Sequence, residues 1–417
     1  MLARRDAWAV ALVATLTMTV SYVDRATFSV LAIEVTKALD ISDEAYGWLQ
    51  IPFNLAYLVA TPLAGWWLDR AGARRGLLIS VLVWSIVAAL HSLVPGFATL
   101  FVLRIALGLA EGPGFPGAAL TMQRVLPAAE RERGFGVLFT GSSIGGMLVP
   151  PLASWLYTIG GWRFAFLGTA AVGLLWVPLW VVVTRRARGQ LDVPAGATRA
   201  RSASLREMLA SSIVWRALVA VLSAAPIFGF AYSWGAKYLA ATFAITQGAV
   251  GGYLWLPPLM FDTGAILFGH LASRQRRAPG VAPRGLYAIA SLLAACLALL
   301  PLAATPWQAM VILGVSMAGG GAQYTLVSAD LLSRMPADSV AFAGGTLACA
   351  QSFALIIVGP LIGWAVTRYG DLVSCQVDMI TLPCVHPSYT VATIAIGIWS
   401  LPGAIAWLVW RVPERLR

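Results

Sequence analysis

Residues 65–75 read GWWLDRAGARR, and this short charged stretch decides how the rest of the chain is interpreted. It holds four charged side chains, Asp69, Arg70, Arg74 and Arg75, between apolar runs at about 46–67 and 77–95. A run of about 20 mostly apolar residues is long enough to cross a bilayer as a helix. We therefore expect residues 65–75 to form a tight turn between two membrane-spanning helices.

The same alternation of long apolar runs and short polar breaks continues through the whole chain. The 417 residues are 59% hydrophobic and only 11% charged, whereas a soluble domain carries roughly 25% charged residues. The pattern predicts twelve spans, at about 8–31, 46–67, 77–95, 98–122, 135–158, 163–184, 213–236, 248–272, 284–304, 306–330, 341–367 and 387–410. The first run is too long for a signal peptide and lacks a cleavage site, so we expect it to be retained as a helix.

The net charge of +11 comes almost entirely from arginine, and the arginines gather in alternate breaks. With the N-terminus inside, the segments expected outside hold only Lys37, Arg163, Lys237 and Arg368. The positive-inside rule then predicts a bacterial inner-membrane protein with both termini in the cytoplasm. A nucleic-acid-binding protein would instead gather its basic residues on one face with interleaved aromatics, and this pattern is missing from the sequence.

An Arg-, Ala- and Ser-rich segment at 185–212 divides the chain into residues 1–184 and 213–417, with six expected spans each. At the matching place in the second half, residues 269–274 read GHLASR, a degraded copy of the first loop without its Asp. The repeated loop resembles the signature of the major facilitator superfamily. The resemblance implies an all-α membrane protein of two six-helix bundles around a central substrate cavity, usually monomeric, with the loop charges forming a cytoplasmic network. The alternative is that Gly and Arg meet by chance at a helix end.

Charged residues inside apolar spans are costly and indicate function by default. They are Asp24, Arg25, Arg104, Glu111 and Asp262. A sixth, Asp330, lies near the end of its span, where an anchoring charge is the better interpretation. Asp262 has an alternative role as a helix-packing hydrogen-bond partner, beside a structural or gating one.

The spacing of the first four charges suggests a mechanism. Arg25 and Arg104 lie at one level, each about six residues from the outer end of its span. Glu111 lies two turns along the same helix face from Arg104, roughly 10 Å deeper and near the midplane. An arginine fork matches a carboxylate, so Arg25 is expected to hold a substrate anion and Glu111 a proton, while Asp24 and Arg104 pair and unpair. The alternative is a static charge cluster that braces the bundle.

Four motifs then match one family: YVDRATFS at 22–29, RIALGLAEGPGFPG at 104–117, GWRFAF at 161–166 and LPPLMFDTG at 256–264. They resemble the anion:cation symporter family, which includes bacterial sugar-acid importers, sialin and the vesicular glutamate carriers. The resemblance implies a proton-coupled importer of a small organic anion that works by alternating access. It also implies that Arg25 binds the substrate carboxylate and that Glu111 carries the proton, with Asp24 and Arg104 linked to it.

The second half departs from the sugar-acid importers, because residues 344–352 read GGTLACAQS without the asparagines that those proteins offer. Candidate substrate contacts are Tyr22, Ser142, Ser143, Gln323, Tyr324 and Gln351. Fewer amides favour a less hydroxylated carboxylate, so a sugar acid, a hydroxy acid and an aromatic acid all stay open. Trp234, Trp255 and Tyr324 form a possible aromatic wall, although aromatics at helix ends more often anchor the bilayer interface.

Two enzyme-like motifs are explained by helix packing. Gly112, Gly114 and Gly117 spell G-x-G-x-x-G, but they lie inside an apolar run with two prolines instead of after a strand. Residues 141–145 spell G-x-S-x-G without a suitable histidine partner, and small residues at a helix interface account for them better. With its histidines scattered and no phosphate-binding loop, the chain is expected to be neither an enzyme nor an ATPase, and to use no cofactor or metal.

Residues 368–386 form an expected polar loop on the outer side, with Cys375 and Cys384 inside it. Because that compartment is oxidising, we expect a disulfide between them. Two rival functions complete the analysis. A proton-driven drug exporter is disfavoured by Arg25 and Arg104, and a non-transporting sensor by the short central segment.

Overall fold

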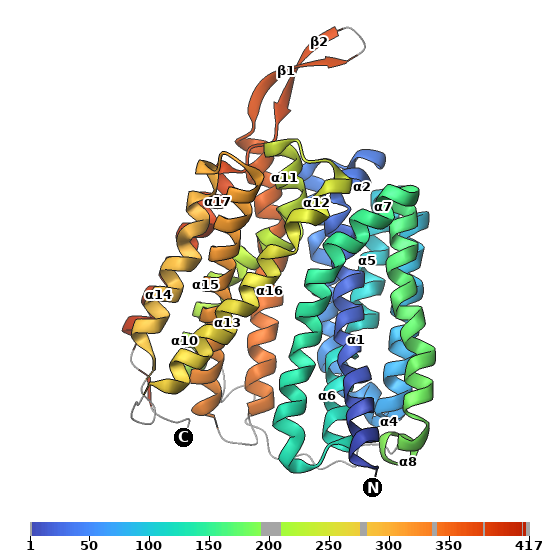
Figure 1. The fold of residues 1–417 in the computed structure, drawn as a ribbon. Coiled ribbons are helices and arrows are strands. Elements are labelled where there is room, and N and C mark those ends of the chain that lie inside the picture. Colours follow the sequence, from blue (N-terminus) through green and yellow to red (C-terminus); the bar gives the residue numbers. More distant parts are fainter. Residues whose placement is uncertain are drawn as a thin grey trace. The chain divides into compact units, whose positions relative to one another are not determined.

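The computed structural model describes residues 2–192, 210–275, 282–335, 340–377, 380–410 and 412–413. It is almost entirely helical and divides into two compact units (Figure 1). Unit 1 contains residues 1–42, 49–198 and 245–255, and unit 2 contains residues 43–48, 199–244 and 256–417. The predicted bundles split the sequence at 185–212 alone, whereas each compact unit also includes a short segment from the other half of the sequence.

Unit 1 consists of helices joined by short turns (Figure 1). In chain order they are α1 (Arg4–Val30), α2 (Ala32–Ala38), α4 (Gln50–Leu90), the 3₁₀ helix η1 (His91–Leu93), α5 (Phe97–Glu111), α6 (Gly114–Val125), the 3₁₀ helix η2 (Ala128–Glu130), α7 (Arg131–Val183), the 3₁₀ helix η3 (Arg185–Ala187), α8 (Arg188–Leu191) and α12 (Gln247–Leu254). Helix α1 packs along α7, which is the most extensive helix contact of the unit.

Unit 2 contains the remaining elements. They are α3 (Asp43–Trp48), α10 (Ser212–Gly229), the π-helix η4 (Phe230–Trp234), α11 (Gly235–Phe243), α13 (Leu256–Arg274), α14 (Arg284–Ala295), the 3₁₀ helix η5 (Cys296–Leu302), α15 (Pro306–Ser333), α16 (Val340–Arg368), β1 (Asp371–Val377), β2 (Ile380–His386) and α17 (Thr390–Val409). Its central helix pair is α13 and α15.

Several helices have the length and hydropathy of membrane spans. Nine of them meet both requirements within the described residues. One is 51 residues long, and helix α7, to which it belongs, is broken at Gly160 and Gly161. Helix α4 is broken in the same way at Gly72. Each long helix is therefore two helices in sequence, as expected for consecutive spans, and the total of twelve spans stays a prediction.

The charged turn at 65–75 depends on one glycine. Gly72 has a φ of +75°, a conformation that side chains with a Cβ rarely adopt. A Cβ on Gly72 would also lie 2.9 Å from the backbone of Leu191 and Asp192 at the end of α8. The break in α4 and the docking of α8 therefore both require glycine at this position.

Two large aromatic side chains in the core of unit 1 have their polar atoms bonded to neighbouring helices. Trp176 and Trp180 stack with ring centroids 5.0 Å apart. Their indole nitrogens donate to the carbonyl oxygens of Val13 and Arg74, at 2.8 and 3.0 Å. Buried tryptophan usually finds such a partner, and here these bonds fix α7 against α1 and α4.

The expected polar loop at 368–386 is instead largely a β-hairpin that projects beyond α16 and α17 (Figure 1). The antiparallel register pairs Val373 with Cys384, Cys375 with Leu382 and Val377 with Ile380. Leu372 pairs with Val385, and this pair alternates with those three, so apolar positions fall on both faces of the hairpin.

The predicted disulfide falls within this hairpin, and the side chains of Cys375 and Cys384 lie outside the described part of the structure. The backbone register places the two residues diagonally, because Cys375 is opposite Leu382. Diagonal positions are typically about 7–8 Å apart, farther than a disulfide spans. The bond stays a prediction, and thiol labelling with and without reductant tests it.

Candidate functional site

The buried charges of unit 1 converge on one carboxylate. Glu111 is the last residue of α5, and Arg25 lies on α1. The Nη2 and Nε atoms of Arg25 donate to Oε2 of Glu111 at 2.8 and 3.2 Å. The Glu111 side chain is completely buried, whereas that of Arg25 is 22% exposed. The exposed part of the guanidinium therefore remains accessible to another anion.

Ser21 completes this ion pair, and the sequence analysis did not identify it. Its hydroxyl donates to the same Glu111 Oε2 at 2.6 Å and accepts from Nη2 of Arg25 at 3.0 Å. Ser21 lies one turn before Arg25 on α1, so both point to the same side. All of these bonds use one carboxylate oxygen, and the other, Oε1, is buried without a hydrogen-bond partner among the described residues.

Aromatic rings surround the Arg25 guanidinium. Its central carbon lies 4.8 Å from the centroid of Tyr22, 5.0 Å from Phe53 and 4.9 Å from Tyr57. Rings within about 6 Å attract a cation through their π faces. The cage holds the guanidinium in place without using up its hydrogen-bond donors. Tyr22 was a predicted site residue, whereas Phe53 and Tyr57 of α4 were not.

Arg104 joins the group from the opposite side of Arg25. Its Nη1 donates to the backbone carbonyl of Arg25 at 3.4 Å, and its guanidinium lies over the rings of Phe28 and Phe53, at 5.0 and 4.8 Å. Its side chain is buried. Arg104 therefore adds positive charge to the site while contacting α1 through the backbone.

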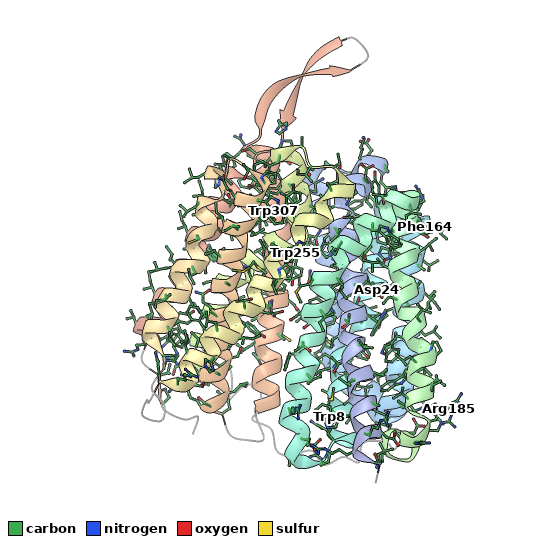
Figure 2. All side chains as sticks on the ribbon, viewed as in Figure 1. Trp8, Asp24, Phe164, Arg185, Trp255 and Trp307 are labelled. Carbon is green, nitrogen blue, oxygen red and sulfur yellow. The ribbon has the colours of Figure 1, made fainter. Side chains whose placement is uncertain are left out.

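Asp24 lies well away from both ends of unit 1 (Figure 2) and is buried on α1. Neither carboxylate oxygen has a hydrogen-bond partner in the described structure, although the indole of Trp84 is close by. Leaving a buried carboxylate without partners is costly unless it is protonated or hydrated. The predicted pairing of Asp24 with Arg104 is not part of this arrangement and stays a prediction for another state.

The side chains of Arg25 and Glu111 lie closer together than the sequence led us to expect. Rise per residue placed Glu111 roughly 10 Å below the level of the two arginines, and this suggested separate substrate and proton sites. In the structure Arg25 and Glu111 form a direct ion pair. Helical rise positions Cα atoms, whereas a long arginine side chain extends over several ångströms, so the two roles meet in one pair.

The two enzyme-like motifs are helix contacts, as the sequence analysis expected. A Cβ on Gly141 or Gly145 would lie 2.4 and 2.6 Å from the carbonyl oxygens of Thr15 and Thr19 on α1. These glycines let α7 approach α1 closely. Ser142 donates to the Phe139 carbonyl of its own helix, and Ser143 is half-buried on the same segment. Gly112 interrupts the path between α5 and α6, where its Cβ would meet Ala60 at 2.5 Å.

Unit 2 contains a small cavity of about 20 Å³, room for about one water molecule, between α10, α13, α15 and α16. It brings together three predicted site residues, Gln323, Tyr324 and Gln351, which line it with Phe228, Phe261 and small aliphatic side chains. Gln323 is buried and donates to the Ser291 hydroxyl at 2.9 Å, while its Oε1 has no partner among the described residues. The cavity thus offers an acceptor within a mostly apolar lining.

The other predicted residues of unit 2 lie apart from this cavity. Asp262 is half-buried on α13 and does not line it. Trp234 packs edge-on against Tyr46 at 4.9 Å in a closed aromatic cluster. Trp255, which belongs to unit 1, donates to the Gly252 carbonyl. Of the proposed aromatic wall, only Tyr324 lines the cavity.

A half-buried ion pair lies beside the aromatic cluster of unit 2. Lys237 of α11 contacts Asp43 of α3 at 2.8 Å, and its ammonium lies 5.3 Å from the centre of the Tyr46 ring. This pair was missed because Lys237 was interpreted only as an outside charge.

The arginines of the charged turn of α4 have an acidic partner that the sequence analysis did not identify. Arg74 contacts Asp192 at 3.2 Å and Thr184 at 3.1 Å, and Arg75 lies 3.9 Å from the same Asp192 oxygen. The side chain of Asp69 lies outside the described part of the structure, and Arg70 is exposed. Asp192 is distant in the sequence, within the central segment, and for this reason the loop pattern did not reveal it.

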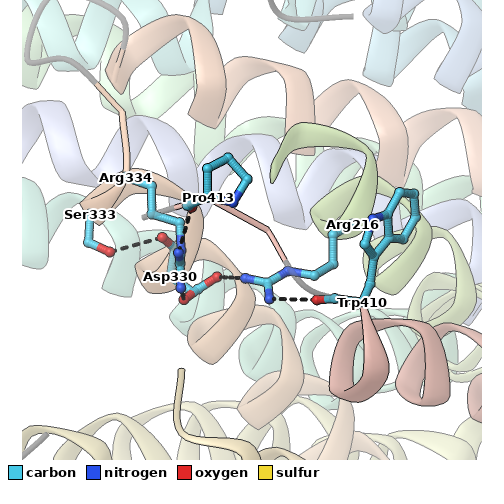
Figure 3. A network of polar contacts seen from close by, with 6 residues as sticks. All are labelled: Arg216, Asp330, Ser333, Arg334, Trp410 and Pro413. Carbon is cyan, nitrogen blue, oxygen red and sulfur yellow. Dashed lines mark hydrogen bonds and ion pairs between the residues drawn. The ribbon is translucent and has the colours of Figure 1, made fainter. Parts of the chain in front are cut away.

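A second buried charge cluster lies at the ends of α10 and α15 in unit 2 (Figure 3). Arg216 and Arg334 both contact the Asp330 carboxylate, the latter at 2.8 Å. Their remaining nitrogens donate to the carbonyl oxygens of Trp410 and Pro413, at 3.3 and 2.9 Å. The anchoring role expected for Asp330 agrees with these contacts. Arg216 was missed, because it is a single charge near the start of an apolar run.

The two sets of groups have distinct chemical capacities. The Arg25 cluster can bind an anion through the Arg25 guanidinium and exchange a proton through the carboxylates of Glu111 and Asp24. The cavity of unit 2 can accept a hydrogen bond from a small, mostly apolar group. Within the described residues, no group of three or more His, Cys, Asp and Glu side chains has the geometry of a metal site.

Comparison with known proteins agrees with this description. The family model of the Major Facilitator Superfamily matches residues 14–360. A hexuronate transporter of Escherichia coli K12 is 26% identical over 288 residues, which cover 66% of this chain and 67% of the relative. A D-galactonate transporter of E. coli O6:H1 is 23% identical over 380 residues, covering 85% and 88%. The crystal structure of a bacterial homologue of the lysosomal transporter Spinster superposes with a TM-score of 0.77 at 19% identity, covering 98% of this chain and 97% of that one.

Proposed function

This chain belongs to the Major Facilitator Superfamily, and from that premise we propose that it imports a small organic carboxylate together with a proton. The relatives named as hexuronate and galactonate transporters support a carboxylate as the transported molecule. The observation that carries the proposal is the pair of Arg25 and Glu111, joined at 2.8 Å within a cage of aromatic rings.

Substrate and proton are coupled because the substrate carboxylate and the carboxylate of Glu111 compete for Arg25. In the structure Glu111 is the partner of Arg25. A substrate carboxylate that binds the guanidinium takes over this role, and an ionised Glu111 would then lack its counter-charge in a buried position. Because a buried charge without a partner is strongly disfavoured, Glu111 takes up a proton as the substrate binds. Release of the substrate returns Arg25 to Glu111 and expels the proton.

Asp24 and Arg104 support this exchange. Asp24 is a second buried carboxylate on α1, next to Arg25 in the sequence. It provides a second carboxylate to which a proton can pass. Asp24 and Glu111 are close enough to interact electrostatically. Arg104 adds positive charge beside Arg25 and favours the arrival of an anion.

The substrate is proposed to be less hydroxylated than a hexonate. A sugar acid needs many hydrogen-bonding partners for its hydroxyl groups, because leaving them unpaired on burial is costly. The proposal rests on residues 344–352, which read GGTLACAQS and lack the asparagines expected of sugar-acid importers. We place a hydroxy acid or an aromatic acid ahead of a sugar acid.

The direction of the arginine bias favours an inner-membrane location with both termini in the cytoplasm. The protein is proposed to work as a monomer and as a transporter that carries out no chemical conversion of its substrate. Its energy source is then the proton gradient, without a cofactor.

Reconstituted proteoliposomes test the function directly. The lumen contains a pH-sensitive dye, the outside is made acidic, and sugar acids, hydroxy acids and aromatic acids are added in turn. We expect one class to accelerate acidification of the lumen. Acidification of the lumen with amphipathic cations alone would indicate a drug exporter instead. An unchanged lumenal pH with every compound and gradient would favour a non-transporting protein.

A further inference from the structure

The N-terminal end of unit 1 has an open, strongly basic hollow that the transport mechanism does not use. Its volume is about 500 Å³, and it is lined by Arg4, Arg5, Trp8 and Arg133. The first three residues lie in the first turns of α1, and Arg133 lies in the first turn of α7. Figure 2 shows Trp8 at this end of the unit. Three arginines from two helices therefore converge on one space.

The hollow carries excess positive charge. Arg4 contacts Glu130 at 2.7 Å, and the Trp8 indole nitrogen donates to the same carboxylate. Arg133 lies over the face of the Trp8 ring, with its guanidinium carbon 5.4 Å from the ring centre. Glu130 is the carboxylate that contacts the lining arginines among the described side chains, so it balances one of three positive charges. The N-terminal ends of α1 and α7 add partial positive charge.

The surface next to the hollow is apolar. Trp8, Leu12 and Leu16 are spaced four residues apart and thus lie on one face of α1. Leu12 and Leu16 are 52% and 40% exposed. In a membrane protein such a stripe contacts acyl chains, whereas tryptophan and arginine favour the headgroup level. The basic hollow therefore lies at the level of a lipid headgroup, at one end of an apolar stripe that an acyl chain can follow.

We propose that this hollow binds the phosphate of an anionic phospholipid, with an acyl chain along Leu12 and Leu16. Arginine forks match phosphate oxygens, and basic pockets at the membrane edge favour anionic headgroups. Soluble phosphate shares the headgroup chemistry but has no use for the apolar stripe, and this favours the lipid. The bound lipid ties α1, the helix that carries Arg25, to α7.

Native mass spectrometry of the full-length protein tests the site. The protein is taken from nanodiscs of phosphatidylcholine and phosphatidylglycerol, and the retained lipid is identified. We expect the wild type to retain phosphatidylglycerol and the Arg5→Gln/Arg133→Gln variant to retain about tenfold less, given the contribution of each basic residue near an anionic headgroup. The matched control is Arg185→Gln/Arg188→Gln, which removes two exposed arginines from the last helices of unit 1 and should change retention less than about twofold.

A second variant changes the site in the opposite direction. Glu130→Gln frees Arg4 and removes the negative charge from the hollow, so retention of phosphatidylglycerol should rise about fivefold. A purely structural role of these residues predicts lower retention instead. Equal retention by wild type and the Arg5/Arg133 double variant would overturn the proposal. Displacement of the lipid by inorganic phosphate alone would reassign the hollow to a soluble anion and equally overturn it.

Discussion

The protein has two buried clusters of arginine and carboxylate, and they differ in how completely their hydrogen bonds are satisfied. In unit 2, Asp330 is bonded by two arginines whose other nitrogens donate to backbone carbonyls. In unit 1, the Glu111 carboxylate uses only one oxygen, and both oxygens of Asp24 lack partners within the described residues. Among the described residues both oxygens of Asp330 are bonded, whereas the second cluster retains unpaired acceptors and an Arg25 side chain that is 22% exposed.

This difference separates a structural from a functional set of charges. A satisfied network fixes helix ends and gains nothing from a ligand. A partly satisfied network is costly when empty and gains when an anion or a proton arrives. The unit 1 cluster is therefore expected to affect transport and the unit 2 cluster to affect folding.

The largest expected effect is on stability, from Asp330→Asn. The change leaves two buried arginines without a counter-charge, and arginine cannot release its proton. Loss of one member of such a network typically costs about 3–5 kcal/mol. Thermal unfolding in detergent should show a markedly lower midpoint. Ser333→Ala, whose hydroxyl bonds only the Asp330 backbone, should change stability by less than about 0.5 kcal/mol. An unchanged unfolding midpoint in Asp330→Asn would contradict the structural role assigned to this cluster.

The next effect is on transport, from Arg25→Gln. We expect uptake of the carboxylate to fall at least about 100-fold, because the charge-assisted fork to the substrate is lost. Stability should fall less than in Asp330→Asn, since the remaining Glu111 can protonate. Arg25→Lys keeps the charge without the fork and should recover only part of the uptake. Normal uptake by Arg25→Gln would make the cluster structural.

A smaller effect is expected from Ser21→Ala. Its hydroxyl bonds both members of the pair, and a hydrogen bond to a charged group is worth about 1.5 kcal/mol or more. Transport should fall about tenfold with the protein still folded. Ser29→Ala, two turns further along α1, is the matched control and should leave uptake unchanged. Equal loss in both variants would point to general damage to α1.

The smallest effect concerns Ser142, which the sequence predicted as a substrate contact. Its hydroxyl is bonded to the Phe139 carbonyl of its own helix. Ser142→Ala should therefore change uptake less than about twofold. A strong loss of uptake would show that Ser142 changes partner during transport and would restore the original prediction.

The sequence predicted the helical membrane architecture, because long apolar runs and the arginine bias need no tertiary contacts to be recognised. It also identified Asp24, Arg25, Arg104 and Glu111 as candidate site residues, because charged residues are rare within apolar runs. The family resemblance is confirmed by the superfamily match and the sugar-acid transporter relatives. Roles of individual residues stay predictions.

The sequence did not reveal partners that depend on three-dimensional contact. Ser21 is an ordinary polar residue in a helix, and only its distance of 2.6 Å from Glu111 marks it. Asp192 is far in the sequence from Arg74, to which it is bonded. Arg216 is a single charge near the start of an apolar run, and its partner Asp330 lies far away in the sequence, on α15. Such contacts depend on how helices pack, and local patterns do not encode that.

The coupling of a proton to the Arg25–Glu111 pair is tested most directly by Glu111→Gln in proteoliposomes. Two signals are followed for the carboxylate identified in the substrate panel: exchange of labelled substrate across the membrane, and acidification of the lumen. We predict that the variant retains exchange and loses acidification, because Gln stays neutral and cannot carry the proton. A variant that exchanges substrate and still acidifies the lumen at the wild-type ratio would contradict the account and move the coupling to Asp24.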